Sequence, residues 1–145
     1  MDFDLTEEQS AFRDSVRAWV DRHYPKAVAR ELERDEETYP EGLWQDLAEA
    51  GFHGIGISEE YGGQGGDAIT QIILSRELTR SLSGLSGVWG ISSFAWAKTL
   101  GLFGTEEQKQ RFLPPLTEGK VRFSIAITEP SGGTDLLGGM RTRIT

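Results

Sequence analysis

Cysteine is absent from the 145 residues of this chain. Without a thiol there is no disulfide, no thiol nucleophile and no thiolate-bound metal, and the absence fits a reducing cytoplasm. The length allows one domain with a core of its own. The apolar share of 37% predicts a folded chain rather than a disordered one.

Positive charge is also scarce. The chain carries 15 lysines and arginines against 23 aspartates and glutamates, which gives a net charge of -8. The densest basic stretch, residues 141–143, holds only two arginines. Nucleic acid and anionic membrane surfaces would repel such a chain, so we expect neither as a partner.

Long hydrophobic runs are missing too. The most apolar stretch, Ser86 to Phe103, contains Lys98 together with several serines and glycines. A membrane-spanning helix requires a longer and cleaner run, so this stretch predicts a buried helix and no membrane insertion. The acidic start, Met1 to Glu8, lacks the basic-then-apolar order of a secretory signal. We therefore expect a cytoplasmic protein.

The common catalytic and metal-binding patterns are not found. His23 and His53 have no partner at ligand spacing, and no serine lies in a GxSxG motif. The acidic pairs 59–60 and 106–107 are sequence neighbours, whose side chains do not face each other on a helix, so we interpret them as solvated. These patterns predict neither a metal site nor a catalytic centre.

The patterns that are present predict a mainly α protein, with an amino-terminal bundle of about five to six helices followed by the first strands of a β-domain. We expect the helical domain to cover residues 1–119 and the truncated β-domain to cover residues 120–145. Apolar periodicity and capping or breaking residues predict helices over Thr6 to Pro25, Pro40 to Gly51, a stretch from Asp67, Val88 to Phe103, and Thr105 to Pro114.

Capping residues mark the starts of three of these helices. Thr6 with Gln9, and Thr105 with Gln108, have the spacing of capping boxes. Asp67 is expected to cap the third helix through its carboxylate. The apolar residues of that helix predict a buried stripe formed by Ile69, Ile72, Ile73 and Leu78.

The helix from Val88 to Phe103 is apolar nearly all round, which predicts a place in the middle of the bundle. Its aromatic residues Trp89, Phe94 and Trp96 could line a ligand cavity. Packing in the core is the more common role for such residues, and the sequence favours it.

Glycine-rich and extended segments separate and follow the helices. The connection from Gly51 to Asp67 contains glycines whose spacing fits neither GxGxxG nor GxxxxGK, so we interpret them as turn residues. Lys120 to Thr128 partly alternates and is rich in β-branched residues, which predicts a strand. A second strand is predicted from Met140 to Thr145.

The segment from Ile125 to Asp135 has the composition of a ligand-binding loop. Pro130 stiffens it, and Gly132 and Gly133 allow backbone N–H groups to approach a ligand closely. Further donors are the hydroxyls of Thr128, Ser131 and Thr134. This suits a phosphate or the polar edge of a flavin, but a glycine-rich turn after a strand is more often only a turn. The residues by themselves leave both interpretations open.

Residues 127–135, ITEPSGGTD, resemble the flavin-loop signature of acyl-CoA dehydrogenases, Thr-Glu-Pro-Gly-Ala-Gly-Ser-Asp. Three further stretches resemble the same family in the same order: LTEEQ at 5–9, ISEEYGGQG at 57–65 and FGTEEQKQRFLP at 103–114. These matches extend over nearly the whole chain. The chain is therefore similar to the amino-terminal part of that family.

The resemblance implies an FAD-dependent oxidation of an acyl-CoA thioester to the 2,3-enoyl-CoA, with electron-transferring flavoprotein as the usual electron acceptor. In this family the glutamate that removes the α-proton belongs to the last domain, which implies no catalytic residue in this chain. The chain would supply the amino-terminal domain and part of the flavin and acyl-CoA site. A homo-oligomer or a complementing chain is implied as well.

The resemblance also implies roles for individual residues. Ile125, Ile127 and Thr128 would border the flavin, mostly through main-chain groups and the Thr128 hydroxyl. Gly133 and Thr134 would contact the pyrophosphate region of FAD, and Thr134 would also contact the acyl-CoA. Ile125 stands where some relatives have an aromatic residue, so only its backbone contact is implied.

The helix with Trp89 and Phe94 would flank the acyl pocket. Glu129, next to Pro130, is interpreted as a loop-ordering residue rather than a base.

Two other interpretations of the chain's function stay open. In the first, the chain is an inactive helical fragment or partner subunit that acts as an interaction module. In the second, it is part of a related acyl-CoA oxidase or flavin monooxygenase.

Overall fold

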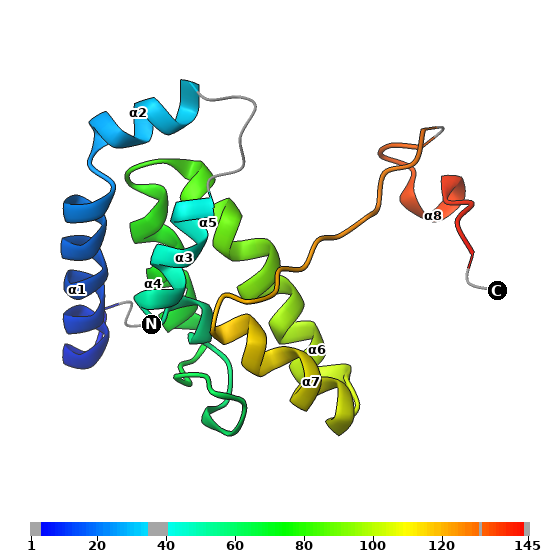
Figure 1. The fold of residues 1–145 in the computed structure, drawn as a ribbon, viewed down its shortest axis with the longest axis horizontal. Coiled ribbons are helices and arrows are strands. Elements are labelled where there is room, and N and C mark those ends of the chain that lie inside the picture. The colour runs from blue at the N-terminus through cyan, green and yellow to red at the C-terminus, as the bar shows by residue number, and fades with distance from the viewer. Residues whose placement is uncertain (1–3, 35–40, 131, 144–145) are drawn as a thin grey trace.

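The computed structural model describes residues 4–34, 41–130 and 132–143, and helices form nearly all of its regular structure. In chain order the helices are α1 (Glu7–His23), α2 (Lys26–Arg34), α3 (Glu41–Glu49), α4 (Ala68–Thr79), α5 (Ser83–Trp89), a π-helix (Gly90–Trp96), α6 (Ala97–Phe103), α7 (Glu106–Thr117) and α8 (Leu136–Gly139). Short 3₁₀ turns at Phe52–Gly54 and Glu59–Tyr61 lie between α3 and α4. Figure 1 shows α1 and α3 to α7 packed together, while the chain that follows α7 runs along the bundle and then leads away from it toward α8. The mainly helical prediction is confirmed.

The predicted caps are present. The Thr6 hydroxyl accepts from the Gln9 amide at 3.1 Å, and the Gln9 side chain accepts from the Thr6 amide at 3.1 Å. Thr105 and Gln108 form the same reciprocal pair at the start of α7. Asp67 accepts from the Thr70 amide at 2.8 Å. These bonds satisfy amide groups that have no partner within the helix, which fixes where each helix begins.

The apolar side chains form two clusters that together make the core. The first joins α1, α3, α4 and α5 through Val16, Val20, Leu43, Leu47, Leu74, Leu78, Leu85 and Trp89. The second joins α3 and the 52–67 connection to α6 and α7 through Trp44, Ile57, Tyr61, Ala97, Leu100, Leu113 and Leu116. Helix α3 thus contributes to both clusters, with Trp44 in one and Leu47 in the other.

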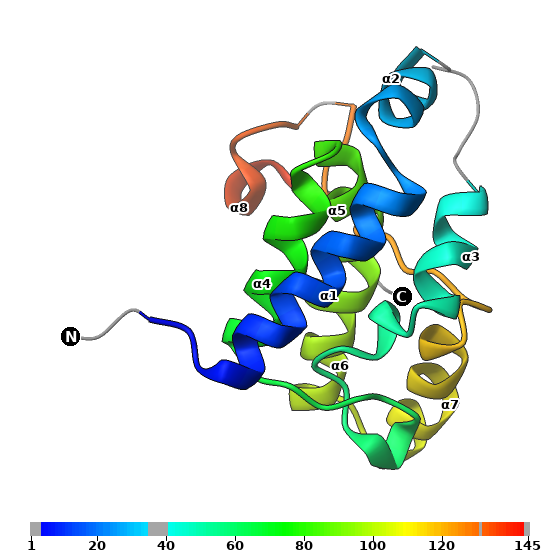
Figure 2. The same cartoon turned by 90° about the vertical axis from the view of Figure 1, so that its left-hand side faces the viewer.

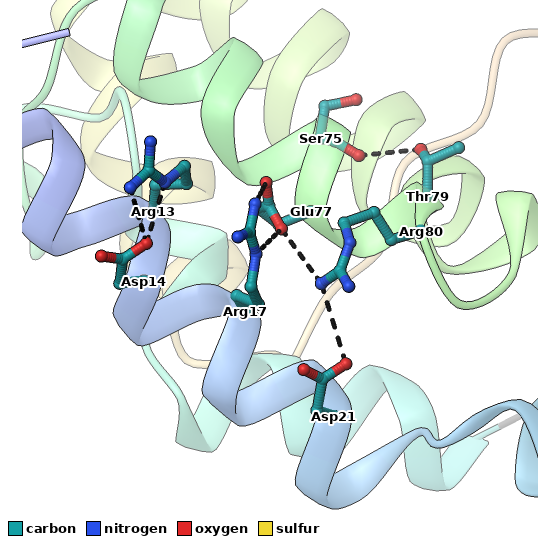
Figure 3. Close-up of polar contacts among 8 residues, drawn as sticks. All are labelled: Arg13, Asp14, Arg17, Asp21, Ser75, Glu77, Thr79 and Arg80. Atoms are coloured by element: carbon teal, nitrogen blue, oxygen red, sulfur yellow. Dashed lines mark hydrogen bonds and ion pairs between the residues drawn. The ribbon is translucent and has the colours of Figure 1, made fainter.

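A polar network crosses the contact between α1 and α4, two helices that lie side by side in Figure 2. The Arg17 guanidinium of α1 donates to both carboxylate oxygens of Glu77 on α4, at 3.0 and 3.1 Å. Arg80 donates to the same carboxylate at 3.3 Å and lies 3.7 Å from Asp21 (Figure 3). The Glu77 side chain is completely buried, so these bonds replace the water that its charge has lost.

Two helix predictions were wrong. Helix α2 was not predicted as a separate element, although Ala29 is buried and Val28 and Leu32 pack against the first cluster. Helix α7 was predicted to stop at Pro114 but continues to Thr117. The two prolines lack amide hydrogens, yet their carbonyl groups accept from Glu118 and Lys120 beyond the helix. The buried Leu113 and Leu116 hold this last turn in the core.

The stripe of four residues that was predicted to be buried on α4 is only partly buried in the structure. Ile73 and Leu78 are buried, but Ile69 is 47% exposed and Ile72 is 61% exposed. Polar residues take inward positions instead, because Glu77 binds Arg17 and the Gln71 amide donates to the Ile55 carbonyl group. Buried polar side chains that have hydrogen-bond partners therefore shift the face that apolar periodicity alone indicates.

The helix expected over Val88 to Phe103 begins earlier, at Ser83, and contains the π-helical turn. Trp89 is buried, but the prediction of burial on all sides was wrong. Its exposed apolar residues are Ile91, Phe94, Leu102 and Phe103. This helix therefore has one face in the core and another that the described residues leave uncovered.

The strands expected over Lys120 to Thr128 and from Met140 are not formed within the described residues. Residues 121–129 run extended without regular structure, and the last two residues of the second predicted strand, Ile144 and Thr145, lie outside the described residues. A strand is stabilised by hydrogen bonds to a neighbouring strand, and among residues 4–34, 41–130 and 132–143 no strand lies beside the extended segment. The division into domains at residues 119 and 120 stays a prediction.

Candidate functional site

The extended segment begins on the surface of the helical bundle. The Ser92 hydroxyl on the π-helix donates to the Phe123 carbonyl oxygen and accepts from the Phe123 amide, both at 2.9 Å. The Trp96 indole donates to the Ser124 carbonyl oxygen at 3.2 Å, and its ring stacks on Phe123 at 4.7 Å. Phe112 of α7 contacts the same ring edge-on. Phe123 is thus fixed against the helices on both its backbone and its side chain.

The next four residues, 125–128, are exposed and take no part in hydrogen bonding within the described residues. Ile125 is 52% exposed and Ile127 is 40% exposed. Thr128, at the end of the segment, is also exposed. The predicted flavin-bordering residues therefore offer free backbone groups, a free hydroxyl and two apolar side chains.

A compact loop follows from Glu129 to Thr142. One Glu129 carboxylate oxygen accepts from the Thr142 amide at 2.7 Å and from its hydroxyl at 2.5 Å. The other oxygen accepts from the Arg141 amide at 2.9 Å. The Thr142 hydroxyl bond and the amide bonds from Arg141 and Thr142 hold the pKa of Glu129 below its ordinary value. One ionised carboxylate therefore bridges the two ends of the loop.

Inside this loop the amides of Gly132, Gly138 and Gly139 donate hydrogen bonds within the loop, whereas Gly133 and Thr134 form none in the described residues. Asp135 accepts from the Gly138 amide at 2.9 Å and caps the short helix α8. Gly133 and Thr134 are exposed, and neither forms a hydrogen bond in the described part of the chain. Ile127 and Gly133 meet at a hollow of about 10 Å³, which is at the lower limit for a single water molecule. Of the predicted site residues, only these two line it.

A second hollow lies where the extended segment meets the helices. It is a groove of about 420 Å³, lined by Gly87, Val88, Ile91, Ser92, Arg122, Phe123 and Ser124. Sequence reasoning missed this groove because it depends on how the segment folds back onto α5. The adjacent serines at 92 and 93, in an otherwise apolar helix, were the available signal.

The remaining polar candidates have structural roles. His53 is fully buried, with one ring nitrogen 2.7 Å from the Ser93 hydroxyl and the other 3.0 Å from the Trp44 carbonyl oxygen. Both nitrogens are therefore occupied, as expected of a structural histidine. No cluster of three or more metal-ligating side chains occurs among residues 4–34, 41–130 and 132–143. No helix in this part of the chain is long and apolar enough to cross a membrane.

The helical fold agrees with the results of three comparisons. A family model described as the acyl-CoA dehydrogenase N-terminal domain matches residues 6–120. The chain belongs to the acyl-CoA dehydrogenase family. The short-chain-specific acyl-CoA dehydrogenase of Clostridium acetobutylicum is 36% identical over 135 residues, which cover 93% of this chain and 35% of that protein.

One further relative and one solved structure extend the comparison. A subunit of the caffeyl-CoA reductase–Etf complex of Acetobacterium woodii is 34% identical over 139 residues, 95% of this chain and 36% of that protein. The crystal structure of an acyl-CoA dehydrogenase from Bacillus anthracis, complexed with FAD, superposes with a TM-score of 0.82. It is 28% identical, and the match covers 94% of this chain and 23% of that chain. This chain spans about a third of the length of the relatives it matches in sequence.

Proposed function

We propose that this chain supplies the amino-terminal helical domain, and part of the flavin and acyl-CoA site, of an FAD-dependent acyl-CoA dehydrogenase. Such an enzyme oxidises an acyl-CoA thioester to the 2,3-enoyl-CoA. The observation that carries the proposal is the family match over residues 6–120. After the extended segment that follows this match comes a loop whose donors at Gly133 and Thr134 are exposed and unpaired in the described structure.

The loop has the chemistry that FAD would require. The Gly133 amide and the Thr134 hydroxyl are free to donate to pyrophosphate oxygens, and Thr134 also to acyl-CoA. Residues 125–128 would border the flavin with free backbone groups, the Thr128 hydroxyl and the isoleucine side chains. The carboxylates of Glu129 and Asp135 are engaged by amide groups of the loop itself, which reduces their repulsion of a bound phosphate. When bound, FAD would accept the hydride from the substrate.

The 145 residues would not supply the general base that removes the α-proton of the acyl-CoA. A general base must lie within hydrogen-bond reach of the proton it removes and must have a free lone pair. Both oxygens of Glu129 already accept hydrogen bonds, and Asp135 caps α8. The base would come from a part of the enzyme that this chain does not match in its relatives. This chain would bind and orient ligands.

The proposed partners follow from the same assignment. Electron-transferring flavoprotein would accept the electrons, since a relative is named as a subunit of a reductase–Etf complex. A second copy or a complementing chain would cover the exposed apolar residues of the π-helix and of residues 125–128. We place the protein in the cytoplasm.

A titration of the labelled chain with FAD, followed by NMR, tests the proposal. The amide signals of Gly133, Thr134 and Thr128 should shift with increasing FAD. The amide signal of Ser58, which lies in a loop on the helical bundle, serves as the control and should not shift. Binding should be weak, because the chain supplies only part of the pocket. If none of the three signals moves, or if the Ser58 signal moves as much, the proposed site is wrong.

Activity requires a second experiment. The chain alone should not bleach flavin absorbance with butyryl-CoA. Bleaching should appear when the last two thirds of the Clostridium acetobutylicum relative are supplied, as a separate chain or fused behind residue 145. Bleaching by the 145 residues alone would contradict the proposed division of the site.

A further inference from the structure

The Glu129 carboxylate is the point at which the two ends of the glycine loop meet. Its two oxygens accept three hydrogen bonds from residues 12 and 13 positions later in the sequence, the Arg141 amide, the Thr142 amide and the Thr142 hydroxyl. Bonds from backbone amides to an ionised acceptor are among the stronger hydrogen bonds in proteins. We call residues 129, 141 and 142 the neck of the loop.

Nothing else in the described residues closes the neck. The backbone bonds inside the loop are local: the Gly132 amide donates to the Glu129 carbonyl group, and the Gly139 amide donates to that of Asp135. No backbone pairing joins residues 125–129 to residues 140–143 in the described structure. A pair of strands would close such a loop with ladder hydrogen bonds. Here one side chain takes the place of that ladder.

The charged groups near the neck do not compete for the Glu129 carboxylate. Asp135 and Arg141 lie on the same loop and Arg143 directly follows it, and none forms an ion pair with Glu129 in the described structure. Asp135 is instead occupied by the Gly138 amide. The Glu129 carboxylate therefore acts through its hydrogen bonds to the neck alone.

We propose that Glu129 is a positioning residue for the glycine loop, residues 129–142. By closing the neck, its carboxylate holds the Gly133 amide and the Thr134 hydroxyl in the arrangement that binds FAD and acyl-CoA. This role rests on the proposed function, and it adds a residue that touches neither ligand. Binding to a preformed loop avoids the entropy cost of ordering that loop when the ligand arrives.

Glu129→Gln tests the role, because glutamine keeps the shape but offers one acceptor oxygen and an NH₂ group that cannot accept from an amide. In the wild-type chain the Arg141 and Thr142 amide signals should follow the titration of Glu129, with a midpoint below the ordinary 4.5. In Glu129→Gln that titration should vanish, and exchange of both amide hydrogens should accelerate about ten- to a hundredfold. Thr142→Val, which removes only the hydroxyl bond, should show a smaller change.

Glu118→Gln is the matched control, because Glu118 is exposed and, among the described residues, pairs with Lys120 on the surface. It should leave the neck amides and the FAD response unchanged. In Glu129→Gln the FAD-dependent shifts of Gly133 and Thr134 should require about ten times more FAD, the loss expected from one charged hydrogen bond.

The outcomes separate this role from the proposed function. Neck amides that neither titrate nor respond to Glu129→Gln would overturn the positioning role. So would an FAD response that is the same in wild type and Glu129→Gln. If FAD shifts no loop signal even in the wild type, the proposed function fails first and the positioning role falls with it.

Discussion

Replacing Glu77 by glutamine should destabilise the chain by about 2 kcal/mol. The Glu77 side chain is 0% exposed, whereas the Arg17 and Arg80 side chains that bind it are each 41% exposed. One hydrogen bond to a charged group contributes about 1.5–3 kcal/mol, and breaking a fully buried ion pair costs about 3–5 kcal/mol. Because both arginines keep access to water after the substitution, we expect a value in the lower range.

The effect should depend on pH. Burial would raise the pKa of Glu77, but the hydrogen bonds and charges of Arg17 and Arg80 outweigh it and hold the pKa below the ordinary 4.5. A carboxylate whose pKa is lowered by folding stabilises the folded state fully above pH 4.5, and this stabilisation is lost as the pH falls through the folded-state value. The difference in unfolding free energy between wild type and Glu77→Gln should therefore shrink in acid.

Thermal melts and urea unfolding at neutral and acidic pH measure this difference. A loss of about 2 kcal/mol should lower the Tm by roughly 5–8 °C for a chain of this size. Asp14→Asn is the matched control, the same change of carboxylate to amide, at a side chain that is 60% exposed and paired with Arg13. It should change stability by less than about 0.5 kcal/mol. Equal losses in the two variants, or a Glu77→Gln loss that is independent of pH, would refute the reasoning.

Three other predictions concern buried and exposed residues. Burial lowers the pKa of His53 to about 4, despite its bond to the Trp44 carbonyl group. Stability should therefore fall as the pH drops from 6.5 toward 4, and an NMR titration of the ring with a midpoint at 6.5 would contradict this. In thermal melts, Trp89→Ala should cost roughly 3–5 kcal/mol, and Phe94→Ala, at 36% exposed, clearly less; equal losses would place Phe94 in the core. In the completed enzyme, Thr134→Val should weaken FAD or acyl-CoA binding about ten- to a hundredfold, and unchanged affinities for both would remove its role.

The sequence predicts best what neighbouring residues decide. The capping box of Thr6 and Gln9 involves two residues three positions apart, and the structure shows both of its bonds. The left-handed backbone at Gly62, with a φ of 79°, likewise agrees with a turn predicted from glycine alone. In both cases the physical cause lies within one turn of chain, so the pattern is sufficient.

Long-range partners account for most errors. Glu77 is buried because Arg17, sixty positions earlier, satisfies its charge, and no local pattern carries that information. Helix α7 continues past Pro114 because Leu116 has a place in the second cluster. The groove beside Ser92 exists only because Phe123, thirty-one positions later, returns to that serine. Each feature depends on a contact that composition and periodicity do not encode.

The residues with proposed ligand roles lie in the part of the chain that is least complete by itself. No buried side-chain nitrogen or oxygen atom in the described residues lacks a hydrogen bond, so the helical bundle satisfies its own polar groups. Residues 125–128 do the opposite, since their backbone groups have no partner within the described structure and Ile125 and Ile127 face solvent. Unpaired extended backbone beside apolar side chains gains most from a neighbouring strand or a bound ligand. We therefore expect residues 125–128 to become ordered when a neighbouring strand or a ligand binds them. The local sequence pattern defines the bundle because the bundle satisfies its own polar groups, whereas residues 125–128 depend on partners outside the described residues.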